Sequence, residues 1–511
     1  MVEALGKVAI PFLGGLGLTW VLECLLTPRP PAPWRRPRAA VVTHVAIWTI
    51  GFGLELILFS RPYVAMANLL AILVLLMLVN NAKFRALREP FVFPDFEYFL
   101  DALRHPRLYL PFLSVPLAVG AAAGYGAAMW LGLTLEPSLT SGSIPAGTFY
   151  ALSIGLAVVG FAVARWSVRR VRVSFEAVQD LRDLGLVATL CSYAYHERQP
   201  AARIAKRSGF ADSSLKPSGA ASQPGRPRDL VCIQSESFFD VRRVYPSVRA
   251  SVLENYDRLC RESLCHGRLR VGSWGANTVR TEFAFFSGMH DADLGIHRFN
   301  PYRRLAQTPV PTFASHLRSL GYRTICIHPY HASFYQRHKV LPNLGFDEFI
   351  DISAFREAHR CGPYVGDIAL AEFAVRFLQE DDERARPLYL HIITMENHGP
   401  LHWEKVAAAD AHAVLNGPLP AGCDDLVAYA RHLRNADASF LTLSQALQAR
   451  KRAGLLCIYG DHVPIMPDVY AKLGYPDGMT DYLVWAPDQT RAGPRRDIPI
   501  QDLADILLRQ L

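Results

Sequence analysis

Residues 454–462 read GLLCIYGDH, an apolar run that ends in a glycine, an acidic residue and a histidine. A short apolar run of this kind predicts a strand that is buried on both faces of a sheet. Three further runs also lead to acidic or histidine residues, namely 230–233 before Glu236, 323–327 before His328, and 388–393 before Glu396 and His398. Because parallel strands open into one crevice at their carboxyl ends, these polar side chains are expected to converge.

Helical patterns alternate with these apolar runs from Asp229 to Leu511. Such alternation is typical of an α/β domain, because each parallel strand needs a crossover connection that covers one face of the sheet. We therefore predict a domain over 229–511 with a mostly parallel sheet covered by helices on both faces.

Three of the converging residues suggest a metal site. Glu236, Asp461 and His462 form a hard, oxygen-rich set with one imidazole, which suits Zn²⁺ or Mn²⁺ with one position left open for substrate. Taken alone, an Asp-His pair such as Asp461-His462 is more often a loop turn or helix cap, and Glu236 could equally be a cap or surface carboxylate. Their shared position after buried strands favours the metal.

A candidate nucleophile lies in residues 272–286, which read GSWGANTVRTEFAFF. Small residues followed by Thr278 and an apolar helical pattern predict a loop that enters a helix, where free backbone N–H groups favour an anion. A threonine at this place is often only a helix cap. A hydroxyl beside a divalent cation, however, loses its proton readily and can attack phosphorus, so Thr278 is the predicted nucleophile.

The first 170 residues have a different character. They contain five apolar stretches, each about as long as the roughly 17–25 residues of a membrane-spanning helix, at Lys7 to Leu26, Ala39 to Ser60, Tyr63 to Val79, Leu108 to Leu133 and Thr148 to Ala164. A cleavable leader would account for only one of them. The whole chain, with 50% hydrophobic and 20% charged residues and a mean hydropathy of +0.12, is also too apolar for an ordinary soluble enzyme. We predict a membrane domain over 1–170 with five transmembrane helices.

Residues 171–228 are expected to connect the two domains. Apolar residues from Phe175 to Leu186 favour one helical face, which predicts an amphipathic helix lying along the membrane. From Glu197 to Arg228 the sequence is rich in Ser, Pro, Gly, Ala and Arg without periodicity, which predicts a flexible linker. The net charge of +8 does not indicate a nucleic-acid partner, because the Arg residues lie beside apolar stretches and in this linker rather than on an aromatic-interleaved basic face.

Four ordered motifs together resemble the lipoteichoic acid synthase family of the alkaline-phosphatase and sulfatase superfamily. They are 235–238 (SESF), 275–283 (GANTVRTEF), 395–400 (MENHGP) and 459–462 (YGDH). The resemblance covers nearly the whole chain, since that family also has five membrane spans, a linker and an outward-facing catalytic domain. It implies that Glu236, Thr278, Asp461 and His462 bind one divalent metal, usually Mn²⁺ with Zn²⁺ or Mg²⁺ as alternatives, and that Thr278 is the nucleophile.

The resemblance also implies a substrate site. The family has a histidine with an aromatic residue seven positions on and an arginine nine positions on, and His328, Tyr335 and Arg337 keep this spacing; His398 matches a later substrate histidine. Tyr335 stands where Trp is common, and Arg280 departs from the small or acidic residues usual beside the nucleophile. Without the spacing, a surface salt bridge would be the default for Arg337.

We therefore expect a membrane-bound phosphotransferase that takes phosphoglycerol from phosphatidylglycerol and transfers it, through a phospho-Thr278 intermediate, to a glycan or glycolipid. His398 would protonate or position a leaving oxygen, and Arg337 would hold phosphate oxygens. The alternatives are a phosphoethanolamine transferase, a phosphodiesterase or sulfatase-like hydrolase, and an inactive membrane scaffold for envelope polymer assembly.

The family resemblance and the distribution of basic residues predict opposite orientations in the membrane. The family implies a bacterial cytoplasmic membrane protein with its catalytic domain outside, as a glycan acceptor also requires. Five spans would then place a basic group outside, comprising Arg29, Arg35, Arg36, Arg38, Lys83, Arg85, Arg88, Arg104 and Arg107. The positive-inside rule favours the reverse. We nevertheless expect the outward orientation.

Overall fold

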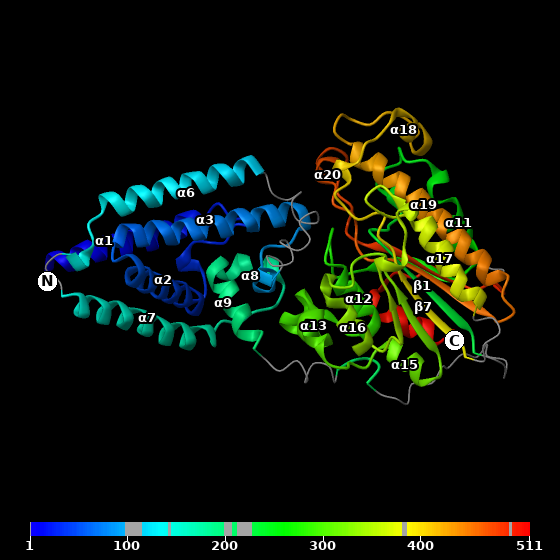
Figure 1. The fold of residues 1–511 in the computed structure, drawn as a ribbon, viewed down its shortest axis with the longest axis horizontal. Helices are drawn as coiled ribbons and strands as arrows, with labels where there is room; N and C mark the ends of the chain where they lie inside the picture. The colour runs from blue at the N-terminus through cyan, green and yellow to red at the C-terminus, as the bar shows by residue number, and fades with distance from the viewer. Residues whose placement is uncertain are drawn as a thin grey trace. The chain divides into compact units, whose positions relative to one another are not determined.

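The computed structural model describes residues 2–97, 115–141, 145–198, 207–211, 227–380, 386–489 and 493–511. The chain divides into two compact units, Met1–Gln199 and Pro200–Leu511 (Figure 1). Each unit has its own buried apolar clusters, and each is described by itself.

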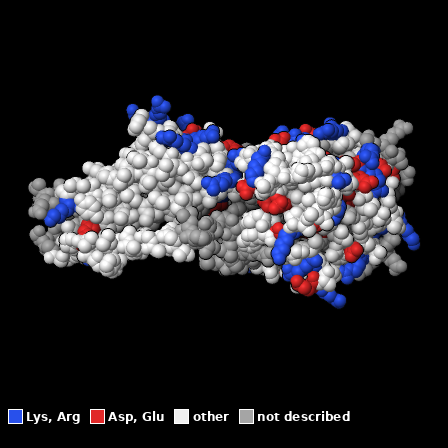
Figure 2. All heavy atoms as spheres, turned by 90° about the horizontal axis from the view of Figure 1, so that it is seen from above, with Lys and Arg blue, Asp and Glu red and all other residues white. Residues whose placement is uncertain are grey.

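Unit 1 consists mainly of long apolar helices. They are α1 (Val2–Glu23), α2 (Arg38–Phe59), α3 (Pro62–Leu87), α6 (Val115–Leu135) and α7 (Ala146–Val168). Among the described residues, α2, α3 and α7 are long and apolar enough to cross a membrane. Apolar side chains on these helices stay exposed, as with Leu58 and Val158, which is expected of a lipid-facing surface. On the face seen in Figure 2, charged side chains are nearly absent from the middle of this unit.

Unit 1 is thus a membrane anchor, and its helices occupy the predicted apolar stretches. The count of five spans stays a prediction. The fourth stretch begins at Leu108, which lies outside the described residues, as do Arg104 and Arg107.

The predicted amphipathic helix is divided into two, α8 (Ala177–Leu184) and α9 (Leu186–His196). The break is at Gly185, whose φ of +84° ends the helical backbone. A carboxylate oxygen of Glu23 accepts the N–H of Leu186 at 3.0 Å, and the same carboxylate pairs with Arg36. Leu181 and Leu186 are buried against other segments of unit 1, so protein covers part of the apolar face expected to contact lipid.

Most of the predicted flexible linker lies outside the described residues, which include only 197–198, 207–211 and 227–228 of this segment. The short piece 207–211 belongs to unit 2. The N–H of Gly209 donates to the carbonyl of Ser287 at 2.9 Å, and the Ser208 hydroxyl donates to the carbonyl of Pro311.

Unit 2 is built on an eight-stranded sheet with the order β10-β2-β9-β8-β1-β7-β3-β4. The strands are β1 (Asp229–Ser235), β2 (Ser263–Arg270), β3 (Arg323–Ile327), β4 (Glu348–Ile350), β7 (Leu388–Ile393), β8 (Gly454–Gly460), β9 (Thr480–Trp485) and β10 (Ile498–Pro499). The neighbours from β8 to β4 pair in parallel, and only β9 runs antiparallel to its two neighbours. The predicted mostly parallel sheet is confirmed.

Helices cover both faces of this sheet. They are α11 (Glu254–Arg261), α12 (Thr278–Ser287), α13 (Asp291–Leu294), α14 (Pro301–Arg304), α15 (Phe313–Ser319), α16 (Arg337–Asn343), α17 (Asp367–Glu380), α18 (Ala408–Val414), α19 (Asp424–Gln448), α20 (Pro467–Leu473) and α21 (Leu503–Leu508). Val231 and Ile233 of β1 pack in the cluster that includes α17 and α19, whereas Leu230 and Cys232 pack in the cluster that includes α12 and α15. Figure 1 shows these helix pairs on opposite sides of the sheet, which confirms the predicted three-layer domain.

Candidate active site

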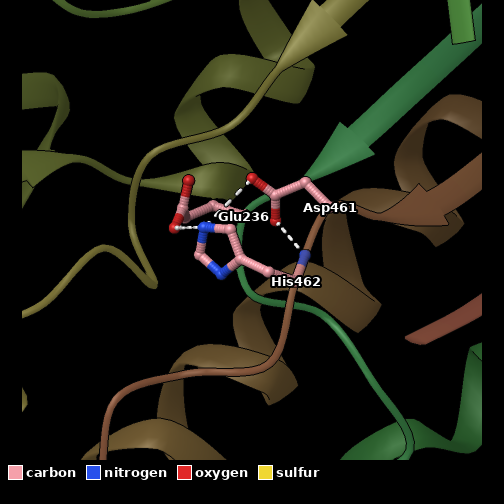
Figure 3. Close-up of side chains that lie close together, drawn as sticks. All are labelled: Glu236, Asp461 and His462. Carbon is pink, nitrogen blue, oxygen red and sulfur yellow. Dashed lines mark hydrogen bonds and ion pairs between the residues drawn. The ribbon is translucent and has the colours of Figure 1, made fainter. Parts of the chain in front are cut away.

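The predicted metal ligands meet at the carboxyl ends of two neighbouring strands. β1 and β8 pair in register as far as Ser235 and Gly460, so Glu236 and Asp461 leave the sheet side by side. His462 follows directly. Figure 3 shows the three side chains pointing toward one another.

The three residues form a compact donor set. One ligand atom from each of Glu236, Asp461 and His462 lies within 4.8 Å of the other two. His462 Nε2 is 3.5 Å from Glu236 Oε1 and 3.4 Å from Asp461 Oδ2. All three side chains are buried, and Asp461 Oδ2 has no hydrogen-bond partner among the described residues.

Electrostatics favour a cation between these groups. Burial and the neighbouring Asp461 carboxylate raise the pKa of Glu236 above its ordinary value, because two buried negative charges repel each other. A divalent ion would offset both effects, since hard cations bind carboxylate oxygens. The donor set therefore fits the predicted metal.

The environment of His462 suits a ligand role. Its Nδ1 lies 3.1 Å from the carbonyl oxygen of Val463, which can only accept a hydrogen bond. This contact assigns the proton to Nδ1 and leaves the lone pair of Nε2 facing the carboxylates. A second hydrogen bond that fixes the tautomer in this way is typical of metal-binding histidines.

Ser237 fixes the carboxylates, a role that sequence reasoning missed. Its backbone has a φ of +54°, which turns the chain sharply after β1. Its N–H donates to Asp461 Oδ1 at 2.8 Å and its hydroxyl donates to Glu236 Oε1 at 2.9 Å. Its place in the SESF motif was the available signal, but its contact with Asp461 spans 224 positions of the chain.

Thr278 lies beside the metal-ligand set. It is the first residue of α12, and Asn277 rather than Thr278 occupies the cap position. The Thr278 hydroxyl is 3.5 Å from His462 Nε2, and the side chain is 8% exposed. The hydroxyl, the three ligands and the N–H groups of the first helical turn thus lie together, as attack on a phosphate requires.

Arg337, the predicted phosphate-binding residue, is almost fully buried at the start of α16. Its Nη2 donates to Glu282 Oε2 at 2.8 Å and its Nε donates to Glu282 Oε1 at 3.3 Å. The ring of Tyr335 lies over the guanidinium, with 5.4 Å between the ring centre and Cζ. The salt bridge considered for Arg337 therefore exists, but in the interior rather than at the surface.

The two predicted substrate histidines follow neighbouring strands, His328 after β3 and His398 beyond β7. Burial lowers the pKa of both, and the positive charge of Arg337 contributes to each shift. The positive charge of Arg337 also acts on Glu236, where it opposes the rise in the pKa of that carboxyl. Both histidines therefore lie within electrostatic range of Arg337, whereas their roles toward substrate stay predictions.

Arg280, the departure from the usual nucleophile loop, faces Phe299. Its Nε donates to the carbonyl of Phe299 at 3.1 Å, and its guanidinium lies over the ring of that residue. The side chain is 9% exposed. The structure therefore gives Arg280 a packing contact with the loop after α13.

Comparisons with known proteins show the family of the chain and several relatives. A sequence profile of the family described as "Sulfatase" matches residues 228–509. The chain is 27% identical over 83% of its length to the capsular polysaccharide biosynthesis protein RkpI of Rhizobium meliloti, of which it covers 77%. It is 27% identical over 73% of its length to a putative cyclic beta-1,2-glucan modification protein of the same species, of which it covers 59%. Lipoteichoic acid synthase 1 of Bacillus subtilis is 26% identical over 28% of the chain, which covers 21% of that protein.

Proposed function

The chain belongs to the sulfatase family, and from that premise we propose that it is a metal-dependent phosphotransferase that moves a lipid head group to a glycan or glycolipid. The donor is phosphatidylglycerol and the transferred group is phosphoglycerol. One observation carries the proposal: the Thr278 hydroxyl lies 3.5 Å from His462, next to Glu236 and Asp461. A buried hydroxyl beside a metal-ligand set is suited to attack phosphorus.

Glu236, Asp461 and His462 would hold one divalent ion, for which we propose Mn²⁺. When bound, the ion lowers the pKa of the Thr278 hydroxyl and stabilises negative charge on the phosphate. Thr278 Oγ1 then attacks phosphorus as the alkoxide, and the bond from phosphorus to the diacylglycerol oxygen breaks. An acceptor hydroxyl next attacks the phosphoglycerol-Thr278 ester and releases Thr278.

His398 is proposed to donate a proton in the first step and to accept one in the second. As imidazolium it gives a proton to the departing diacylglycerol oxygen, and as neutral imidazole it takes a proton from the acceptor hydroxyl. Its Nδ1 is 2.8 Å from the carbonyl of Gly399, which leaves Nε2 for this exchange. Because burial lowers the pKa of His398, its imidazolium is a stronger acid than that of an exposed histidine.

The anchor and the relatives support the substrate class. In the described part of the chain, three helices are long and apolar enough to cross a membrane, and such helices would keep the chain where phospholipids are available. The two most extensive relatives carry names that concern a capsular polysaccharide and a cyclic glucan, which supports a glycan as acceptor. We propose a bacterial cytoplasmic membrane protein whose catalytic domain faces outward, where such glycans lie.

The test is transfer from labelled lipid in membranes that contain the chain. Phosphatidylglycerol labelled in its head group should yield unlabelled diacylglycerol and a labelled glycan or glycolipid. Exclusive transfer from phosphatidylethanolamine would establish the phosphoethanolamine alternative, and release of free glycerol phosphate would establish a hydrolase. No turnover of either lipid in metal-loaded membranes would favour the scaffold.

The nucleophile is tested in the same assay. Thr278→Ala should abolish turnover, and the labelled covalent adduct formed by the unaltered chain should disappear. The variant should still fold, because loss of even a capping hydroxyl costs only about 0.5–2 kcal/mol. Ser287→Ala is the matched control, since its hydroxyl lies at the other end of α12, where it donates to the carbonyl of Phe283 and accepts the N–H of Met289. Substantial turnover by Thr278→Ala would exclude this nucleophile.

A further inference from the structure

Glu282 is the centre of a buried polar cluster beside the nucleophile. It lies on α12 four residues after Thr278, so both side chains project from the same face of the helix. Its side chain is fully buried. Four groups approach its carboxylate: Arg337 Nε and Nη2, the Tyr302 hydroxyl, and Gln234 Nε2 at 3.4 Å.

The contact leaves part of Arg337 available. Nε and Nη2 form a fork on the carboxylate, whereas Nη1 is buried and has no hydrogen-bond partner within the described part of the chain. A buried N–H without an acceptor is unfavourable, particularly on a cation. A phosphate oxygen is an acceptor of the kind that a guanidinium binds best.

The pair also keeps both partners charged. Burial disfavours the carboxylate of Glu282, but Arg337 outweighs this effect and holds the pKa of Glu282 below its ordinary value. Burial opposes the charge of Arg337 as well, and Glu282 raises the pKa of Arg337 above its ordinary value. The guanidinium is therefore a fixed cation in an interior where a lone cation would be strongly disfavoured.

We propose that Glu282 is a positioning residue, which ties Arg337 to the helix of Thr278 and aims its free Nη1 at a phosphate oxygen of the substrate. The inference rests on the proposed function and deepens it. In this arrangement α12 bears the attacking hydroxyl of Thr278. The same helix also positions the guanidinium of Arg337, because Glu282 on α12 binds it. Their separation is set by one helical turn, and such orientation lowers the barrier of a transfer step.

A purely structural role is the competing explanation, in which the pair only holds α16 against α12. The two roles differ in how Glu282 and Arg337 depend on each other. If Glu282 is a positioning residue, its substitution no longer changes phosphate binding once Arg337 has been replaced. If its role is structural, its substitution changes phosphate binding whether or not Arg337 is present.

The experiment compares Glu282→Asp in the unaltered chain and in the Arg337→Gln background. Aspartate keeps the charge but draws the guanidinium back by one methylene. The full chain, loaded with metal in detergent and lipid, is titrated with inorganic phosphate, and transfer from phosphatidylglycerol is measured in parallel. Glu404→Asp is the matched control, because Glu404 forms an ion pair with Arg431, which the proposed mechanism does not use.

We expect Glu282→Asp to weaken phosphate binding about tenfold and to lower kcat about 10²-fold, with metal content unchanged. In the Arg337→Gln background it should change neither quantity further. Equal losses in both backgrounds, or a phosphate affinity unaffected by Glu282→Asp, would overturn the inference.

Two further results complete the test. If Glu282→Asp does not fold, the neutral double variant Glu282→Gln/Arg337→Gln replaces it, and phosphate binding equal to that of the unaltered chain would overturn the inference. Phosphate binding that depends on Glu282 without any lipid turnover would leave the inference standing and refute the proposed function.

Discussion

At the scale of single residues, the two carboxylate oxygens of Asp461 have different surroundings. Asp461 Oδ1 accepts the N–H groups of Ser237 and His462, at 2.8 and 2.9 Å. Asp461 Oδ2 has no hydrogen-bond partner in the described ranges and lies 3.4 Å from His462 Nε2. One oxygen thus orients the side chain, and the other is left to bind a cation.

Replacing the charge of Asp461 without changing its shape should therefore remove the metal. Mutation of a residue that only hydrogen-bonds to a metal ligand typically lowers metal affinity about 10- to 100-fold. We expect Asp461→Asn, which alters a ligand itself, to lower metal affinity by more than this and to lose activity in parallel. Elemental analysis of the purified chain measures the metal. Asp437→Asn is the control, because Asp437 is a buried carboxylate outside the ligand set that accepts the N–H groups of Asn255 and Tyr256. Unchanged metal content in Asp461→Asn would exclude the ligand set.

At the scale of elements, the site depends on how closely the end of β8 approaches the turn after β1. A Cβ on Gly460 would overlap the carbonyl oxygen of Phe238. The predicted strand-Gly-Asp-His pattern thus has a steric reason. Only glycine lets the backbone of β8 pass the turn so closely that Asp461 reaches Ser237 and Glu236.

Gly460→Ala should separate β8 from this turn. Because the clash involves backbone, relief requires a backbone shift, which we expect to cost about 1–3 kcal/mol of stability and to lower metal content. Thermal unfolding and elemental analysis of the full chain measure both effects. Gly417→Ala is the control, since its Cβ would have no atom within 4 Å. Normal metal content and stability in Gly460→Ala would refute this explanation of the glycine.

At the scale of the whole molecule, the interior of the catalytic domain disfavours the protonated form of a buried histidine. His391 on β7 is fully buried among the rings of Phe285 and Phe286. Burial lowers the pKa of His391 from 6.5 to about 3. The folded chain therefore stays unprotonated at His391 under mildly acidic conditions in which the unfolded chain takes up a proton.

Stability should fall on acidification for this reason. Above pH 6.5 neither state is protonated at His391, and the group contributes no pH dependence; below it, the unfolded state binds one more proton, down to about pH 3. This contribution has a limiting slope of about 1.4 kcal/mol per pH unit. His391→Gln should make the decline of the melting temperature between pH 6 and pH 4 shallower. An unchanged slope would show that His391 is protonated in the folded chain.

The orientation of the whole molecule in the membrane is a separate prediction. Fusions after Leu511 to a reporter active only outside the cytoplasm and to one active only inside should give activity of the outside reporter alone. The reason is that the proposed glycan acceptor would lie outside, even though the basic group between Arg29 and Arg107 favours the reverse orientation under the positive-inside rule. Activity of the inside reporter alone would overturn the orientation and the proposed glycan acceptor.

The sequence by itself determined the class of fold and the meeting of the three predicted metal ligands. Apolar runs in a parallel sheet must be buried, and polar residues that follow them must gather at the same edge. This local rule placed Glu236 beside Asp461 and His462 although they are more than 220 positions apart. The apolar length of α2, α3 and α7 likewise indicated a membrane anchor.

Tertiary structure alone decided how these residues are held. The fork between Glu282 and Arg337 and the close approach at Gly460 depend on contacts between distant segments, which no local pattern encodes. The division of α8 from α9 has the same origin, because Glu23 from the first helix binds the N–H of Leu186. Periodicity reports which face of a segment is buried, whereas pairing of buried charges depends on which side chains meet in the folded interior.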